Sequence, residues 1–99
     1  MGRVKEPVAQ RLLDALKQQD RRRILKLAVE SDTPLSPSLA SKKLPAPLSS
    51  TARNFKVLAT AGLIALSSEV AKRGAIEHFY VPTEDALNHP IVQAVLMCM

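Results

Sequence analysis

The sequence predicts a mainly α-helical protein with one small β-hairpin and an additional helix after it. Apolar residues recur at helical spacing through most of residues 7–62. Two short apolar runs, 63–70 and 75–81, then flank a polar segment that contains a glycine, which is the pattern of a hairpin. Aromatic residues are scarce, with two Phe and one Tyr, so the core must be aliphatic, as in packed helices.

Three helices are expected at the start of the chain. The first covers residues 7–19 and opens on a proline, which suits the first turn of a helix. Asp20 is expected to cap a second helix over residues 21–30. Ser36, followed by a proline, predicts the N-cap of a short helix over residues 37–43. The inward-facing residues of the second and third helices are predicted to be Ile24, Leu25, Leu27, Ala28, Leu39 and Ala40.

The fourth helix is the most informative stretch. Ser49 is expected to be its N-cap, and Gly62 to close it in a left-handed turn. Thr51, Phe55 and Leu58 recur at i, i+4 and i+7, which makes one inward face. The opposite face carries hydroxyls and cations without an acid: Ser49, Ser50, Arg53 and Lys56. A helix that is packed on one side and cationic on the other suits a DNA major groove.

The order of elements predicts a winged helix-turn-helix domain with an additional C-terminal helix. The third and fourth helices would form the helix-turn-helix pair, and the hairpin would be the wing. Helix starts are expected again at residues 83–85 and 88–90. We expect residues 1–6 to be a loose segment and residues 7–99 to be one domain with a C-terminal dimerisation helix.

Three segments resemble, in order, those of ArsR-type winged-helix repressors. Residues 22–27, Arg-Arg-Ile-Leu-Lys-Leu, are similar to the second helix of that family. Residues 35–40, Leu-Ser-Pro-Ser-Leu-Ala, resemble the entry of its third helix, and residues 48–64 resemble its recognition helix and the turn after it. The match covers residues 10–81 and implies a DNA-binding repressor with a winged helix-turn-helix fold.

Two departures from that family pattern bear on function. Residues 35–43 contain no Cys, His, Asp or Glu, so the family's metal sensing is not carried over, and no metal site or cofactor is expected. Asn54 stands where many members have histidine. Because asparagine keeps a donor and an acceptor, DNA contact remains expected with an altered sequence preference.

Charge and composition restrict the function classes. The net charge of +5 favours a polyanionic partner, and three aromatic residues are too few for a single-strand stacking platform. A lone cysteine, Cys98, together with the lack of a signal peptide or long apolar run, predicts a cytoplasmic protein without a membrane segment. The sequence has no glycine-rich phosphate loop, paired catalytic acids or Cys/His nucleophile arrangement, so we expect no enzyme. His78 and His89 are interpreted as surface or hydrogen-bonding residues, with metal binding as the alternative.

The residues expected to contact double-stranded DNA lie on the fourth helix and at the hairpin tip. For each of these residues the alternative is that it belongs to an ordinary solvated surface. Ser49 could simply cap its helix. The arginines of residues 21–23 are expected to be solvated, with phosphate contact as the alternative use that their unfavourable place at a helix start suggests. The predicted DNA-binding set is Ser49, Ser50, Arg53, Asn54, Lys56, Lys72 and Arg73.

An apolar stripe on the last helix predicts a homodimer. Left uncovered, the stripe would expose apolar surface, which soluble proteins avoid; the alternative is that it closes the core of its own chain. The predicted interface joins the first and last helices through Val8, Leu12, Leu16, Ile91, Val92, Val95, Leu96 and Met99.

The sequence therefore predicts a dimeric, sequence-specific DNA-binding transcriptional regulator of bacterial type, most simply a repressor. The alternative is a winged-helix module that binds another protein as a scaffold or anti-regulator. No small-molecule effector is identified by the sequence.

Overall fold

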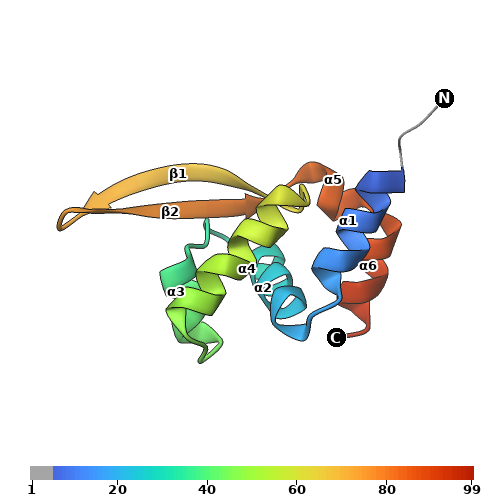
Figure 1. Ribbon diagram of the computed structural model, residues 1–99, viewed down its shortest axis with the longest axis horizontal. Coiled ribbons are helices and arrows are strands. Elements are labelled where there is room, and N and C mark those ends of the chain that lie inside the picture. Colours follow the sequence, from blue (N-terminus) through green and yellow to red (C-terminus); the bar gives the residue numbers. More distant parts are fainter. Residues whose placement is uncertain (1–5) are drawn as a thin grey trace.

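The computed structural model describes the backbone of residues 6–99 and the side chains of residues 10–99, and the predicted loose segment lies outside these residues except for Glu6. Figure 1 shows helices at one side and a long hairpin that projects from them. The predicted order of elements is confirmed. The elements are α1 (Glu6–Leu16), α2 (Gln19–Glu30), α3 (Pro37–Lys43), α4 (Leu48–Thr60), β1 (Ile64–Lys72), β2 (Ala75–Pro82), α5 (Glu84–Asn88) and α6 (Pro90–Met97).

Of the three N-cap predictions for the first four helices, one is confirmed and two are wrong. Ser36 is the N-cap of α3, and its Oγ accepts a hydrogen bond from the Leu39 N–H at 3.1 Å. The prediction that Ser49 caps α4 is wrong, because the helix begins at Leu48 with Pro47 as its N-cap. The prediction that Asp20 caps α2 is also wrong, since that residue lies inside the first turn.

The end of α4 is formed as predicted. Gly62 has φ +81°, a left-handed conformation that a residue with a side chain rarely adopts. The chain then turns directly into β1, and Leu63 and Ile64 are buried beside the helix they follow.

The wing is a two-stranded antiparallel hairpin. Its register runs from the Ile64–Pro82 pair at the base to the Lys72–Ala75 pair next to the tip, with an irregularity between Leu66 and Ser68. The tip turns through Arg73 and Gly74, which both have positive φ.

One additional bridge ties the base of the wing to the helices. Leu35 and Tyr80 exchange two backbone hydrogen bonds of 2.9 Å. This bridge lies directly before Ser36, the N-cap of α3. The wing and the helix-turn-helix pair are therefore joined through backbone as well as side chains.

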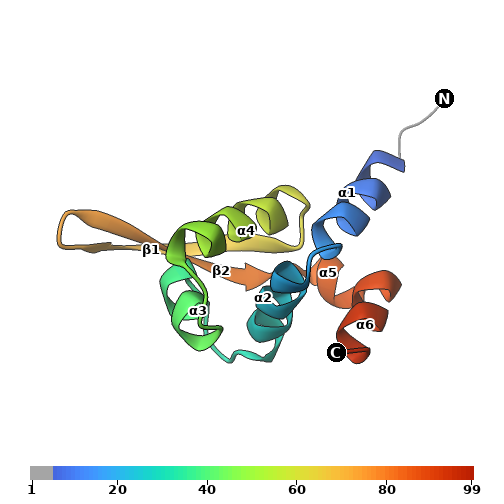
Figure 2. The same cartoon turned by 60° about the horizontal axis from the view of Figure 1, so that its bottom comes forward.

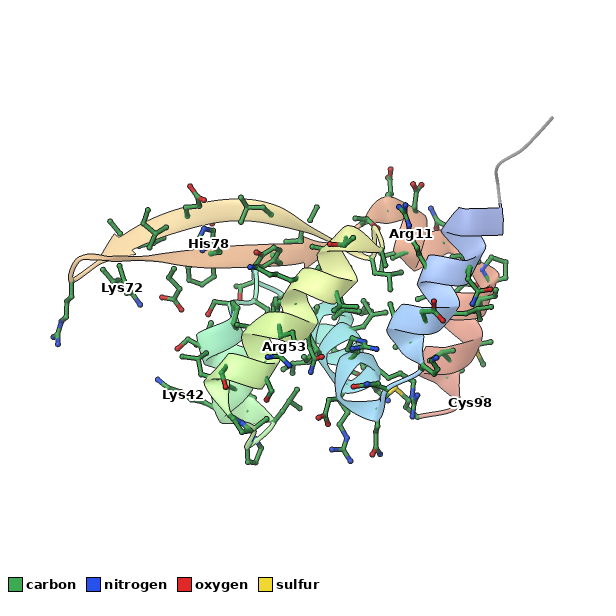
Figure 3. All side chains as sticks on the ribbon, viewed as in Figure 1. Arg11, Lys42, Arg53, Lys72, His78 and Cys98 are labelled. Atoms are coloured by element: carbon green, nitrogen blue, oxygen red, sulfur yellow. The ribbon has the colours of Figure 1, made fainter. Side chains whose placement is uncertain are left out.

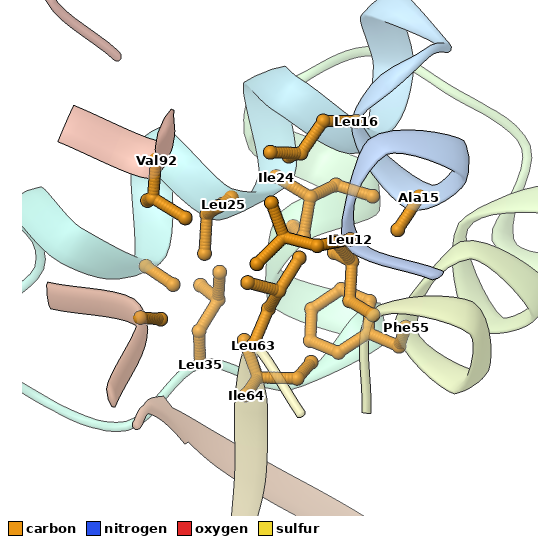
Figure 4. Packing of buried hydrophobic residues seen from close by; sticks show 14 residues of the cluster. Leu12, Ala15, Leu16, Ile24, Leu25, Leu35, Phe55, Leu63, Ile64 and Val92 are labelled. Atoms are coloured by element: carbon orange, nitrogen blue, oxygen red, sulfur yellow. The ribbon is translucent and has the colours of Figure 1, made fainter. Parts of the chain in front are cut away.

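One aliphatic core joins the helices to the base of the wing (Figure 4). The predicted inward face of α4 is confirmed, because Thr51, Phe55 and Leu58 are all buried. The ring of Phe55 packs against that of Tyr80, with centroids 5.4 Å apart. On α3 the prediction is half right: Ala40 is fully buried, whereas 37 % of Leu39 is exposed.

The two short C-terminal helices start at the two predicted sites. Thr83 caps α5 by accepting a hydrogen bond from the Ala86 N–H, and His89 caps α6 by accepting one from the Ile91 N–H through Nδ1, each at 3.1 Å. His89 therefore has a structural use. None of the helices in the described part of the chain is long and apolar enough to cross a membrane.

The predicted interface assumed that the apolar stripe of the last helix would be exposed in a single chain. Part of that stripe instead packs into the core of its own chain. Leu12, Leu16 and Val92 are at most 5 % exposed within the single chain. Their apolar area is already removed from water, so no partner is needed to cover them. Ile91, Val95 and Leu96 are half-buried against the same core, Met99 is exposed, and the side chain of Val8 lies outside the described residues.

Candidate nucleic-acid interface

Helices α3 and α4 and the wing lie at one end of the molecule, while α1 and α6 lie at the other (Figures 1 and 2). Figure 3 shows a labelled cation on each of the three elements of the first end: Lys42 on α3, Arg53 on α4 and Lys72 on the wing. A recognition helix flanked by a wing can place cations both in a DNA groove and along its phosphates.

The outward face of α4 presents four of the predicted contacts to solvent. Ser49, Ser50, Arg53 and Lys56 are all exposed. The Ser50 hydroxyl donates to the Pro47 carbonyl at 3.1 Å and keeps its oxygen lone pairs for a further partner. No ion pair in the described part of the chain involves either cation, so both are available for an external anion.

Asn54 does not belong to that outward face, and the prediction that it reads bases is corrected. Only 8 % of it is exposed, and its Oδ1 accepts a hydrogen bond from Arg21 Nη1 at 3.3 Å. An amide held inside the helix packing cannot reach a base edge without breaking that contact. Asn54 instead joins α4 to α2.

Two arginines at the start of α2 are structural, which corrects the expectation that they are solvated. Arg21 donates from Nε to the Ala15 carbonyl at 2.7 Å and from Nη2 to the Asp14 carbonyl at 3.1 Å. Arg22 Nη1 donates to the Leu16 and Lys17 carbonyls at 2.8 and 2.9 Å. These carbonyls lie at the end of α1, where a helix leaves acceptors without internal donors and where cations are favourable. The two arginines therefore supply donors to the free carbonyls at the C-terminal end of α1.

On the wing, the predicted contact residue Lys72 is engaged by an acid. Its Nζ lies 2.9 Å from Glu77 Oε1, and the other carboxylate oxygen accepts a 2.6 Å hydrogen bond from the buried Ser36 hydroxyl. The Ser36 hydrogen bond, followed by the one from Lys72, lowers the pKa of the Glu77 carboxyl. Lys72 remains largely exposed, but part of its charge is balanced, whereas Arg73 at the tip has no such partner among the described residues.

The sequence analysis missed an apolar element of this surface. A cleft of about 490 Å³ lies between α3, α4 and the wing, and Leu48 and Ile76 line it with more than half of each residue exposed. Lys56 and Lys72 line the same cleft. Exposed aliphatic groups beside cations match a major groove, which presents thymine methyl groups as well as polar base edges. No signal in the sequence marks Leu48, because it lies three residues before Thr51 and seven before Phe55, at the spacing of the inward face, and yet is exposed.

Nothing in the described part of the chain forms a metal cluster. No three His, Cys, Asp or Glu side chains gather there. His78 Nε2 lies 3.0 Å from Glu69 Oε2 on the neighbouring strand, which makes it a cross-strand partner. Cys98 is exposed at the end of α6.

Known proteins resemble this chain in structure rather than in sequence. No family model matches the sequence, and no curated protein matches it. Solved structures do match over nearly the whole chain. The fold is that of a winged helix-turn-helix protein. The reduced form of HlyU from Vibrio cholerae superposes with a TM-score of 0.67 at 22% identity, covering 94% of this chain and 85% of that one.

Two further structures give the same result. A second HlyU structure has a TM-score of 0.66 at 22% identity, with 94% of this chain and 88% of that chain covered. A protein from Methanosarcina mazei described as a possible transcriptional regulator has a TM-score of 0.61 at 18% identity, with 92% and 78% covered. At these identities the likeness concerns the fold.

Proposed function

We propose that this chain is a sequence-specific DNA-binding transcriptional regulator that acts as a homodimer. The observation that carries the proposal is the outward face of α4, where Arg53 and Lys56 are exposed and free of acidic partners among the described residues, on a helix-turn-helix with an adjoining wing. A major groove about 12 Å wide admits such a helix, and base edges there accept hydrogen bonds from arginine and lysine. Repression is proposed because the sequence resembles ArsR-type repressors.

Each contact has a role in this proposal. Arg53 and Lys56 reach base edges, Ser49 and Ser50 hold phosphates near the start of α4, and Arg73 meets the backbone at the wing tip. Lys72 contributes its charge from within the Glu77 pair. Leu48 and Ile76 add apolar contacts in the cleft beside the helix.

The dimer interface proposed here differs from the one expected from sequence. Large apolar side chains that remain exposed at the α1 and α6 end are the available surface, and they add to the half-buried Ile91, Val95 and Leu96. A two-fold interface there would place two recognition helices in successive major grooves, with half-sites about 10 bp apart or a multiple of that. The exposed side chains are Leu13, Leu87, Met97 and Met99.

Two measurements test this proposal. Fluorescence anisotropy on duplexes selected from a random library, over a salt series, should give tighter binding to an enriched site than to random DNA, with a slope set by the phosphate contacts. Sedimentation equilibrium should give a dimer that Met97→Asp dissociates, because the substitution buries an unpaired charge. Absence of an enriched site would exclude specific recognition, and a monomeric parent would exclude the two-half-site arrangement.

A protein-binding module is the second candidate, and the exposed apolar residues of the DNA-facing end favour it. Leu39 and Leu48 lie exposed on the two helices of the pair. If the chain bound no duplex DNA even at low salt, these residues and the cleft beside them would be the surface to test for a protein partner.

A further inference from the structure

A groove between α1 and α4 combines an apolar floor, made by residues at the edge of the core, with a cationic rim. It is open to solvent and has a volume of about 400 Å³, which is within the range of small-molecule sites. Ala15, Val57 and Ala61 supply the apolar part of its lining. Three helices contribute to it, so its shape is set by the packing of the domain.

The rim of the groove is strongly cationic. Arg11 from α1 and Arg53 and Lys56 from α4 line it and are exposed, and Arg21 lines it from α2. The guanidinium of Arg21 is held in place by hydrogen bonds to the Ala15 and Asp14 carbonyls and to Asn54. Gathering like charges around an apolar space costs free energy that a bound anion would recover.

The one acidic residue of the lining is directed elsewhere. The carboxylate of Asp14 lies 3.8 Å from Lys17 Nζ and accepts a hydrogen bond from Gln10 Nε2 at 3.3 Å. No ion pair of the described residues joins it to Arg11, Arg53 or Lys56. The cations of the groove therefore lack an internal counter-charge in the described part of the chain.

We propose that this groove binds a small organic anion, a molecule with an apolar body and a carboxylate, sulfonate or phosphoryl group. The body would lie on Val57 and Ala61, and the acid group would accept hydrogen bonds from Arg11 and the α4 cations. A DNA backbone would use the cations but not the apolar floor, so the combination favours a small amphipathic ligand.

The position of the groove gives such a ligand a regulatory effect, a step that rests on the proposed DNA-binding function. Arg53 and Lys56 line the groove and are also the proposed base contacts. A bound anion would engage the same side chains, so ligand and DNA compete. By linkage, each lowers the affinity of the other by the same factor.

The first experiment measures ligand binding without DNA. The probe is anilinonaphthalene sulfonate, followed by its fluorescence, with phenylnaphthylamine as the matched neutral compound. The sulfonate should bind, and the neutral compound should bind at least about tenfold more weakly, as expected when a charge-assisted hydrogen bond is removed. Equal affinity for the two compounds would overturn the proposal, since the site would then be only an apolar patch.

Three variants locate the bound probe. Arg11→Ala removes a rim cation and Thr60→Phe adds bulk at an exposed position of the lining, so each should weaken sulfonate binding by about tenfold. Lys26→Ala is the matched control, because it removes a cation from α2 that pairs with Glu30 and does not line the groove. If Arg11→Ala and Thr60→Phe bind the probe like the parent, the site is elsewhere and the proposal fails.

The second experiment measures competition on a duplex that the parent binds. Raising the sulfonate concentration should weaken DNA binding as a competitive ligand, and Arg11→Ala should raise the sulfonate concentration needed for that effect by about tenfold while retaining DNA binding. If the sulfonate binds but DNA affinity does not change, the competition is overturned. If Arg11→Ala weakens DNA binding and leaves sulfonate binding unchanged, the groove serves the DNA backbone instead. If no duplex binds, the proposed function fails while the first experiment still decides the site.

Discussion

The cations of α2 and those of α4 are the same residue types put to opposite uses. Arg21 and Arg22 direct their guanidinium groups to backbone carbonyls at the end of α1. Arg53 and Lys56 extend from the surface without a partner among the described side chains. Arg21 and Arg22 lie at the start of α2 beside the end of α1, whereas Arg53 and Lys56 lie in the middle of α4 on its exposed face. Charge in a sequence therefore indicates a binding surface only after the internal acceptors have been assigned.

The largest expected effect contrasts the two sides of α4. Leu58→Ala should lower the free energy of unfolding by about 2–5 kcal/mol, because the leucine is fully buried and its truncation leaves a cavity. Leu48→Ala on the same helix is the control, since 54 % of that residue is exposed. Denaturant unfolding measures both. A similar small effect in the two variants would contradict the assigned inward face.

The next effect tests the structural cations. Arg21→Ala should destabilise the fold by about 1–3 kcal/mol, because the Ala15 carbonyl and the Asn54 amide oxygen would lose the hydrogen bonds that Arg21 donates. Arg23→Ala, at an exposed position beside it, should leave the unfolding midpoint nearly unchanged. Equal midpoints for the two variants would mean that Arg21 is merely a surface charge.

The α4 cations should show the reverse behaviour. Arg53→Ala and Lys56→Ala should each weaken binding to the selected site by about 1–3 kcal/mol and relax sequence preference, with thermal stability retained. Anisotropy titration and a melting curve on the same samples measure the two effects. Parent-like binding by both variants would remove α4 as the reading element.

A smaller effect is expected at the wing. Arg73→Ala should weaken binding to all duplexes alike and reduce the salt slope by about 0.9 for each phosphate that is no longer neutralised. Lys72→Ala should change the slope less, because Glu77 already balances part of its charge. A change in sequence preference at constant slope would instead indicate that the wing reads bases.

The smallest expected effect is on the pH dependence of stability, through Glu77, which connects the wing to the start of α3. Because hydrogen bonds from Ser36 and Lys72 lower the pKa of Glu77, its contribution to stability is present above the ordinary value of 4.5 and disappears as pH falls through the lowered value. An NMR titration of the carboxyl carbon measures this pKa, and Lys72→Ala should raise it toward the ordinary value. An unchanged titration would show that the ion pair does not form in solution.

The sequence predicted the helices and hairpin because their periodicity is local. The inward face of α4 follows directly from the spacing of Thr51, Phe55 and Leu58. The same spacing also predicts that Asn54 faces inward, because it lies three residues after Thr51 and four before Leu58 and therefore shares their face. The Ser49 cap failed because α4 begins one residue before it, at Leu48, with Pro47 in the N-cap position.

Contacts between distant segments could not be predicted in this way. The partner of Arg21 on α4 is 33 residues away, and Ser36 and Glu77 are 41 residues apart. The apolar stripe of α6 has the same pattern whether it covers its own core or a second copy, and only the packed chain shows that Val92 is buried while Met99 stays exposed. Which groups meet across the fold is a property of packing.

The hairpin has a consequence for behaviour in concentrated solution. Beyond the bridge between Leu35 and Tyr80, it pairs with no other strand of the described chain, so both outer rows of backbone donors and acceptors face solvent toward the tip. Val70 and Ile76 lie exposed there, which favours edge-to-edge pairing between molecules. The charged side chains of Glu69 and Lys72 on β1 oppose it, as gatekeepers that protect an unpaired strand. Removing those charges would turn the wing into the site from which aggregation begins.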